Sequence, residues 1–376
     1  MRCPRCGNTD PRWFYHGSQG WYCRKCVAYG NRAAEPDDQM RLVDPEYHLP
    51  FELTPAQKQV SDRLAELSRK GRGVLLQAVC GAGKTELVMA AVSAALARGE
   101  HVGFAIARRQ VVLEIAQRLT QAFSGLTVVA VCQGHTERTA GDIVVCTTHQ
   151  LFRYPGYFDL LIIDEPDAFP YKDDEVLHGL AAASCRGRTV YLTATPDGQL
   201  LEEVRRRRLV RLYLGRRPHG HPLCVPRACY GPPPWLWVRG LAWLTAMTRR
   251  RRPVMVFVPS RRLGWIIYLL VKPFTAACHL DSTTAGKDEV IAGFKAGRWR
   301  VCVCTSVLER GVTIPGVSVM VVEADHPVYD QAALVQISGR VGRAASQPDG
   351  DCLLLCRQRM EKIDACIADI TAANAA

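Results

Sequence analysis

Four cysteines near the start of the chain have the spacing of a metal site. Cys3 and Cys6 form one C-x2-C pair, Cys23 and Cys26 form a second, and sixteen residues lie between the pairs. In zinc ribbons, two such pairs donate four thiolates to one tetrahedral Zn²⁺. A segment of about 30 residues buries too little surface to fold alone, so the ion would supply its folding energy. The spacing predicts a zinc-binding module, with a redox pair or chance spacing as the alternative.

Aromatic residues lie between these two cysteine pairs, among arginine and lysine. Such side chains stack on the bases of single strands in many nucleic-acid-binding proteins. They would equally form the small core of the ribbon, so both roles stay open. The residues are Trp13, Phe14, Tyr15, Trp21 and Tyr22.

A second group of residues has the pattern of a phosphate-binding loop. An apolar run over Gly73–Ala78 leads into glycines followed by lysine and threonine, and a helix rich in alanine follows. Strand, glycine loop and helix in this order form a P-loop, whose backbone N–H groups surround phosphates at a helix N-terminus. Lys84 would reach the β- and γ-phosphates of ATP, and Thr85 would bind Mg²⁺. The expected nucleotide contacts are Gly81, Ala82, Gly83, Lys84, Thr85 and Asp164.

Adjacent carboxylates follow a second apolar run, Leu160–Ile163. At the end of a buried strand downstream of a P-loop, this pair has the Walker B arrangement. Asp164 would hold Mg²⁺ directly or through water, and Glu165 would orient and deprotonate the attacking water. A solvated turn is the alternative for an Asp-Glu pair taken alone.

Two arginines near the end of the chain have the spacing of a phosphate clamp. Arg340 and Arg343 follow Gln336, and three residues of separation would place both guanidinium groups on one helical face. An arginine supplied by a neighbouring domain stabilises charge on a transferring phosphoryl group. We therefore expect Gln336, Arg340 and Arg343 to be catalytic, against the alternative of surface salt bridges.

The elements that must position these residues alternate between strands and helices. Alternation of this kind predicts α/β domains with parallel sheets and helices on both faces, and ligands at the carboxyl ends of the strands. We expect a zinc module over 1–35, an ATP-binding domain over 36–213 and a second sheet domain over 214–376. The predicted strands are Gly73–Ala78, His101–Ala107, Thr127–Cys132, Ile143–Thr147, Leu160–Ile163, Thr189–Thr193, Val254–Val258, Ala276–Leu280, Val301–Thr305, Val317–Val322 and Cys352–Cys356.

Several strand ends carry polar residues. Arg108 follows one strand, and Thr147 and Thr148 end another, so these side chains would contact a phosphate backbone. Thr193-Ala-Thr195 lies one strand beyond the carboxylates and would couple nucleotide state to movement. The region 214–252 has little periodicity and yields no motif.

Composition and charge exclude several classes of protein. With 48% hydrophobic and 22% charged residues the chain is globular, and its longest apolar run, Ile266–Val271, is far shorter than the ~20 residues of a membrane helix. No secretory leader opens the chain, so we expect an intracellular protein whose other twelve cysteines fill buried positions. The formal charge of +12 divides into +4 over 1–35, −1 over 36–213 and +9 over 214–376. Two basic runs, Arg205–Arg208 and Arg249–Arg252, add to the indication of a nucleic-acid partner, with arginine-rich codon usage as the alternative.

Taken together, these motifs resemble helicase superfamily 2, whose glycine loop has the form A-x-x-G-x-G-K-T. More narrowly, Asp164–Tyr171 is similar to the D-E-V-D-A-F-P-Y string of the late-competence family ComFA, with Pro166 as the departure. The four-cysteine ribbon also fits that family, and Asp281–Thr284 resembles its H-S-T-D segment loosely. The segments that resemble motifs I, Ia, Ib, III, V and VI are Ala78–Thr85, Ala107–Glu114, Thr147–Leu151, Thr193–Pro196, Thr305–Gly311 and Gln336–Arg343.

The resemblance implies two tandem RecA-like domains that use ATP, Mg²⁺ and Zn²⁺. It implies a DNA-stimulated ATPase that translocates on single-stranded DNA and draws it into the cytoplasm during natural transformation. Partners would be a membrane DNA-uptake channel, other competence proteins and further copies of the chain, at the inner face of the membrane. Gln57 would contact the adenine side, and Thr305 would join Arg108, Thr147 and Thr148 on the strand. The alternatives are a replication-restart or repair helicase, and an RNA helicase.

Overall fold

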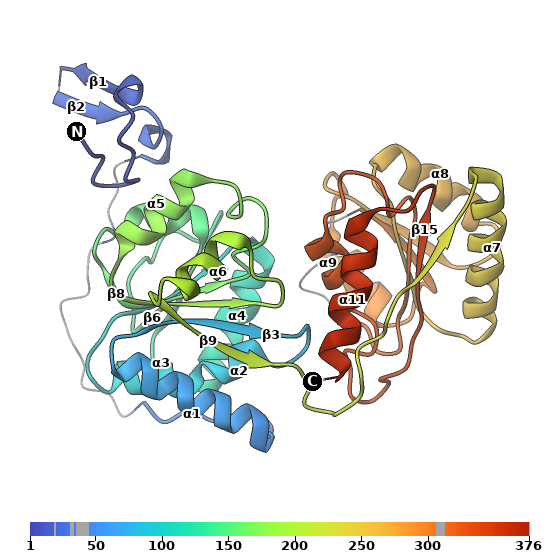
Figure 1. Cartoon of the computed structure of the whole chain (residues 1–376), viewed down its shortest axis with the longest axis horizontal. Helices are drawn as coiled ribbons and strands as arrows, with labels where there is room; N and C mark the ends of the chain where they lie inside the picture. Colours follow the sequence, from blue (N-terminus) through green and yellow to red (C-terminus); the bar gives the residue numbers. More distant parts are fainter. Residues whose placement is uncertain (19, 31–33, 35–44, 306–312, 376) are drawn as a thin grey trace. The chain divides into compact units, whose positions relative to one another are not determined.

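The computed structural model describes residues 1–18, 20–30, 34, 45–305 and 313–375 of the chain. It divides into two compact units, Met1–Ala78 with Gly83–Leu214, and Val79–Ala82 with Gly215–Ala376. Each unit carries one large sheet whose strands are all parallel, and helices cover both faces of it (Figure 1). The predicted fold class, two RecA-like α/β domains with a four-cysteine module at the N-terminus, is confirmed.

The sheet of the first unit has seven strands in the order β5-β6-β4-β7-β8-β3-β9. Its strands are β3 (Gly73–Ala78), β4 (Val102–Ile106), β5 (Val128–Val131), β6 (Ile143–Thr147), β7 (Phe158–Asp164), β8 (Cys185–Thr193) and β9 (Leu209–Leu214). Its helices are α1 (Pro55–Arg69), α2 (Lys84–Leu87), α3 (Met89–Leu96), α4 (Arg109–Ala122), η3 (Thr148–Arg153), α5 (Glu175–Ser184) and α6 (Gly198–Arg205). All of the strands predicted for this half are present, and β9 is a further strand at the edge.

Local sequence explains where α1 begins. Thr54 caps the helix, its hydroxyl accepts a hydrogen bond from the Gln57 N–H, and the Gln57 side chain accepts one from the Thr54 N–H. This reciprocal capping box satisfies backbone donors that the first turn cannot pair, and Pro55 stands where no donor is needed.

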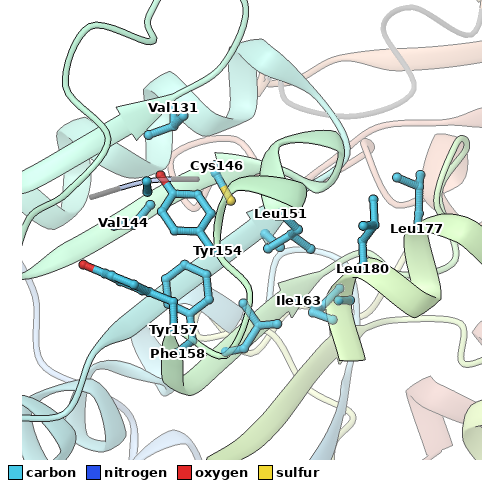
Figure 2. Close-up of a cluster of buried hydrophobic side chains, with 14 of the residues drawn as sticks. Val131, Val144, Cys146, Leu151, Tyr154, Tyr157, Phe158, Ile163, Leu177 and Leu180 are labelled. Carbon is cyan, nitrogen blue, oxygen red and sulfur yellow. The ribbon is translucent and has the colours of Figure 1, made fainter. Parts of the chain in front are cut away.

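One face of the first sheet carries a core of aromatic and aliphatic side chains. Leu161 and Ile163, alternate residues of β7, belong to this core together with Leu177 and Leu180 of α5 and Leu151 of η3. Figure 2 shows Ile163 beside Leu180 and Leu151. Tyr154 and Phe158 are fully buried there, with ring centroids 5.0 Å apart. This packing fixes β7, and with it the carboxylates at its end.

The second unit has a six-stranded sheet in the order β10-β15-β14-β11-β13-β12. Its strands are β10 (Arg227–Tyr230), β11 (Val254–Phe257), β12 (Ala277–Leu280), β13 (Val301–Cys304), β14 (Ser318–Val321) and β15 (Cys352–Cys356). Its helices are α7 (Pro233–Arg249), α8 (Arg261–Val271), α9 (Lys287–Lys295), α10 (Gln331–Ser338) and α11 (Glu361–Ala375). α7 and α8 pack on one face of the sheet, where Trp243 and Ile267 meet alternate residues of β11 and β15.

The region 214–252 is more regular than its sequence indicates. β10 and the whole of α7 lie within it, although no strand or helix is predicted there. Prolines at 232–234 obscure the helix signal, yet Pro233 and Pro234 occupy the first turn, where a missing N–H costs nothing. The helix buries Leu236, Trp243 and Met247 at helical spacing.

The cysteines outside the N-terminal cluster act mainly as fillers, as predicted. Nine of these twelve thiols are buried, and Cys185, Cys224 and Cys229 are half-buried. None forms a disulfide among the described residues. Within the described ranges, no helix combines the length and apolar character needed to span a bilayer.

The N-terminal module is a two-stranded hairpin held by the cysteine cluster. β1 (Phe14–Gly17) pairs antiparallel with β2 (Gly20–Cys23), and short turns η1 (Pro11–Trp13) and η2 (Val27–Tyr29) flank the pair. The module lies against α5 of the first unit (Figure 1). A Cβ at Gly179 of α5 would come within 1.9 Å of the Cys6 carbonyl oxygen, so only glycine permits this approach.

Candidate functional site

The glycine loop has the backbone that a phosphate site requires. Gly81 and Gly83 adopt φ values of 84° and 80°, which side-chain-bearing residues rarely reach. Lys84 begins α2 and donates to the Ala78 carbonyl oxygen at 3.4 Å, so its ammonium group folds back over the loop. Thr85 is buried in the first turn of α2. Successive N–H groups at a helix N-terminus form a concavity suited to phosphate.

Gln57 lies beside this loop. Its side chain is buried, and its Nε2 atom would be 3.0 Å from a Cβ built on Gly83. Its Oε1 atom accepts hydrogen bonds from the N–H and hydroxyl of Thr54. The carboxamide is thus oriented by the helix cap, and its contact with the adenine side stays a prediction.

The carboxylates predicted at a strand end occupy the last residue of β7 and the one after it. Strand β8 separates β7 from β3 in the sheet, and because all three strands are parallel, β7 and the strand before the glycine loop end at the same edge. Glu165 has a φ of 53°, and its N–H donates to the Leu192 carbonyl oxygen at 2.8 Å. A left-handed backbone at a residue other than glycine costs on the order of 1–3 kcal/mol and is common where a catalytic side chain must be aimed.

Asp167 links the carboxylate segment to the next strand, a role that the sequence analysis missed. Its two oxygens accept hydrogen bonds from the hydroxyls of Thr193, at 2.6 Å, and Thr195, at 2.9 Å. The Thr193 hydroxyl in turn accepts from the Thr195 N–H. Asp167 and Thr193 are buried, so this network connects the segment after β7 to the end of β8 without intervening solvent. The sequence signal for this role is the third carboxylate of the D-E-x-D spacing, which the motif of adjacent carboxylates does not include.

Arg340 and Arg343 do not share a helical face, so that expectation is wrong. α10 ends at Ser338, and both arginines lie in the turns that follow, where Gly342 has a φ of 65°. Gly339 is the C-cap of α10, and Gly342 adopts a left-handed backbone that a helix does not use, so the helix cannot continue through the arginines. Gln336 remains in the last turn of α10 and is buried.

Arg217 holds the backbone of the turn that carries these arginines, and no sequence motif marks it. Its buried guanidinium donates to the carbonyl oxygens of Gly339, Val341 and Gly342 at 2.7–2.9 Å. Burial lowers the pKa of Arg217 to about 10, so the charge persists at neutral pH. Because one charged guanidinium donates to three of its carbonyl oxygens, the backbone of this turn is held in a single conformation.

The residues expected to contact a strand lie where the sequence places them. Arg108 precedes α4, Thr147 ends β6 and Thr305 follows β13. The Thr148 hydroxyl is buried and has no hydrogen-bond partner among the described residues. Ser306 to Gly311, the rest of the segment that resembles motif V, lie outside the described residues. The nucleic-acid contacts themselves stay predictions.

The basic run at 205–208 is largely paired. Arg205 and Arg206 contact Glu202, and Arg208 contacts Glu203, at 3.0–3.2 Å. These contacts are solvent-exposed and of the kind that contributes little to stability. They agree with the solvated-face alternative for a charge run more closely than with a free phosphate-binding patch.

The four cysteines gather into one buried cluster. Their sulfur atoms all lie within 4.8 Å of one another, with Cys3–Cys26 at 3.7 Å and Cys6–Cys23 at 3.8 Å. Four sulfurs around one tetrahedral ion with ~2.3 Å bonds are about 3.8 Å apart, so the donor set fits Zn²⁺. Burial raises the pKa of the Cys6 thiol to about 11, so a bound cation is what would hold this sulfur as a thiolate.

Two family models match the chain. The helicase conserved C-terminal domain matches residues 239–345, and the res subunit of type III restriction enzymes matches residues 50–198. These matches cover the two sheets separately, and helicase domains of this kind use ATP and Mg²⁺. The chain therefore carries the ATPase domains of a superfamily 2 helicase.

Solved structures show the same fold at low sequence identity. S. cerevisiae Dbp5 bound to RNA and ADP BeF3 has a TM-score of 0.58 at 16% identity, covering 85% of this chain and 91% of that one. RecG bound to a three-way DNA junction has a TM-score of 0.60 at 20% identity, covering 86% of this chain and 45% of that one.

Curated relatives are more similar in sequence. The competence protein ComFA of Streptococcus pneumoniae is 34% identical over 379 residues, which cover 93% of this chain and 85% of the relative. ComFA of Bacillus subtilis is 34% identical over 382 residues, which cover 94% of this chain and 81% of the relative. The chain therefore belongs to the ComFA family of competence proteins.

Proposed function

We propose that this protein is an ATP-driven translocase on single-stranded DNA that draws DNA into the cytoplasm during natural transformation. The observation that carries the proposal is the edge of the first sheet, where the glycine loop and the Asp164–Glu165 pair end parallel strands. The hydrogen bonds of Asp167 with Thr193 and Thr195 support a conversion of nucleotide state into movement. Membership of a family of competence proteins supports the pathway.

In the proposed reaction, the loop N–H groups and Lys84 bind the phosphates of ATP. Thr85 and Asp164 would hold Mg²⁺, which would neutralise charge on the phosphates of ATP. Glu165 accepts a proton from the attacking water and orients its lone pair toward the γ-phosphorus. Arg340 and Arg343 stabilise charge on the transferring phosphoryl group, and Gln336 is the third proposed catalytic residue of this segment.

For the strand, we propose contacts from Arg108, Thr147, Thr148 and Thr305. The charge distribution supports this, because the positive excess lies outside the ATP-binding segment 36–213. We also propose that the cysteine cluster binds one Zn²⁺, supported by its buried sulfurs, which all lie within 4.8 Å of one another. Metal analysis should find about one zinc per chain, lost on replacement of Cys3 and Cys6 by serine, whereas retention of zinc by that variant would contradict the ligand assignment.

The setting follows from the pathway. We propose a cytoplasmic protein at the inner face of the membrane, with a DNA-uptake channel and other competence proteins as partners. Self-association is part of this proposal, because a motor with several copies around one strand releases it less often.

The test is steady-state ATP hydrolysis with single-stranded DNA, duplex DNA or RNA added. We expect stimulation mainly by single-stranded DNA, and no activity in Lys84→Ala. Arg205→Ala is the matched control, because this exposed side chain forms a surface salt bridge with Glu202. Stimulation by RNA alone would favour an RNA helicase, and no stimulation by any nucleic acid would refute the translocase.

A further inference from the structure

Four aromatic side chains of the N-terminal hairpin are exposed, and nothing within the module covers them. Trp13, Tyr15, Trp21 and Tyr22 are 41%, 50%, 60% and 38% exposed. A small core would bury them, so the core alternative left open by the sequence is excluded for these four residues. Phe14, half-buried against the cysteine cluster, is the aromatic residue that serves the core.

Strand register explains which side chains face outward. Tyr15 pairs with Tyr22, and the Arg24 N–H donates to the Trp13 carbonyl oxygen, so these four residues share one face of the hairpin. Phe14 pairs with Cys23, which points to the cysteine cluster on the opposite face. We call Trp13, Tyr15, Tyr22 and Arg24 the aromatic stripe.

The side chains of the stripe are held in place by one another. The rings of Tyr15 and Tyr22 are 5.9 Å apart, and the Arg24 guanidinium lies 4.3 Å from the centre of the Tyr15 ring. A Cβ at Gly17 would meet the Tyr22 ring at 3.2 Å, so a bare backbone makes room for that ring. Flat rings with a guanidinium at one end match the alternation of bases and phosphates along a single strand.

The charge of the module favours a polyanion over a protein partner. Residues 1–30 contain five basic side chains and one acidic one, Asp10. Asp10 is itself paired with Arg12, at 2.8 Å. One Zn²⁺ on four thiolates would remove two units of charge and still leave the module positive.

The module is also fixed to the ATP-binding unit and not tethered loosely beside it. Lys25 contacts Glu175 of α5 at 3.1 Å, and Val176 of α5 packs on the cysteine cluster. Two residues of η3, His149 and Phe152, also contact the module. The ring centres of Tyr29 and His149 are 6.2 Å apart, and the Arg5 guanidinium lies 5.9 Å from the centre of the Phe152 ring. η3 begins at Thr148, one of the proposed strand contacts, so a strand on the stripe and the ATPase share one rigid support.

We propose that the aromatic stripe binds single-stranded DNA by stacking bases on Tyr15 and Tyr22 while Arg24 contacts phosphate. This rests on the proposed function and adds a second strand-binding site outside the two sheets. Arg24 contributes a salt-dependent part of the affinity, whereas the stacked rings contribute a part that depends little on salt.

The test is the binding of a fluorescent oligo-dT by the full chain with zinc present, followed by anisotropy. Tyr15→Ala with Tyr22→Ala should weaken binding by roughly 5- to 150-fold for each stack lost, at low and high salt alike. Arg24→Ala should lower the slope of log affinity against log salt by about one. Tyr15→Phe with Tyr22→Phe keeps both rings and should bind within about twofold of wild type. Phe274→Ala, which removes an 86% exposed ring of the second unit, is the matched control.

The outcomes separate this inference from the proposed function. For the alanine pair we expect full zinc content, an unchanged maximal ATPase rate and a raised DNA concentration at half-maximal stimulation. Unchanged oligo-dT affinity in a pair that keeps its zinc would overturn the stripe as a DNA site, even where DNA-stimulated hydrolysis persists. Loss of binding to a competence protein, with oligo-dT affinity intact, would overturn it in favour of a protein interface. A wild type with no DNA-stimulated hydrolysis would instead refute the proposed function.

Discussion

The hydrogen bond between Asp167 and the Thr195 hydroxyl can be tested by measuring whether the two residues are energetically coupled. Such coupling would connect the carboxylate segment after β7 to the end of β8. We consider Asp167→Ala, Thr195→Val and the double variant. The first removes the carboxylate, and the second removes only the hydroxyl while keeping the shape of the side chain. If the two groups interact as the 2.9 Å distance indicates, their effects will not add.

The structure sets the expected size of the effects. A hydrogen bond to a charged group contributes about 1.5–3 kcal/mol, and an unpaired buried hydroxyl costs about 1–3 kcal/mol. Asp167→Ala strands the Thr193 hydroxyl, which is fully buried, so we expect a loss of about 3 kcal/mol in local stability. Thr195 is half-buried and regains water, so Thr195→Val should cost about 1 kcal/mol. The coupling energy from the double-mutant cycle should be about 1–2 kcal/mol. The cavity left by Asp167→Ala is present in both the single and the double variant, so its cost cancels.

Native-state hydrogen exchange is the suitable assay, because a chain of two units does not unfold in a single step. Opening free energies are measured for peptides that cover β7 and β8. Asp174→Ala is the matched control, because this carboxylate caps α5 by accepting hydrogen bonds from the Val176 and Leu177 N–H groups and not from Thr195. It should cost about 1 kcal/mol and couple to Thr195→Val by less than about 0.3 kcal/mol.

A functional measurement distinguishes a role in coupling ATP hydrolysis to DNA from a purely structural role. In Asp167→Ala we expect ATP affinity within about threefold of wild type, with stimulation by single-stranded DNA largely lost. Additive effects on local stability, or full stimulation in Asp167→Ala, would refute the reasoning.

The remaining predictions concern the attacking water, the arginine turn and the docked ribbon. Glu165→Gln should lower kcat for ATP by roughly 10²- to 10⁴-fold with little change in KM, as measured by steady-state hydrolysis; an equal fall in ATP affinity would contradict a role as base. The lysine in Arg217→Lys cannot donate to three carbonyl oxygens, so we expect the free energy of unfolding of the second unit to fall by about 2–4 kcal/mol. Urea unfolding monitored by the fluorescence of the tryptophans in 215–376 measures this loss. Arg205→Lys should change the same free energy by less than about 0.5 kcal/mol. Gly179→Ala should push the ribbon off α5 and raise hydrogen exchange in residues 1–30, whereas Gly198→Ala, with open space at its Cβ, should not; equal protection in both would show that the approach of Cys6 is not tight.

Much of the fold follows from the sequence because the signals are local. Apolar runs bounded by glycine mark the central strands, and the Thr54 cap marks the start of α1. β9 and β10 escape detection, since edge strands are short and only partly buried, with no continuous apolar run. α7 escapes because prolines at its first turn resemble a loop.

The residues of the candidate site likewise divide into those in local motifs and those whose partners are distant in sequence. Lys84, Thr85, Asp164 and Glu165 stand in contiguous motifs, so their order along the chain reveals them. Arg217 does not, because its partners Gly339, Val341 and Gly342 are more than a hundred residues away and are backbone atoms. The stacking role of the hairpin aromatics also needs the structure, because register and exposure decide which face each ring takes.

The central claim is that ATP hydrolysis moves this protein along a single strand, and displacement of streptavidin from biotinylated oligonucleotides measures this most directly. We predict that wild type with ATP strips streptavidin from one end of single-stranded DNA much faster than spontaneous release, with a rate that rises with oligonucleotide length up to a limit. Glu165→Gln should bind the same DNA and displace nothing. DNA-stimulated hydrolysis without displacement from either end would contradict the account.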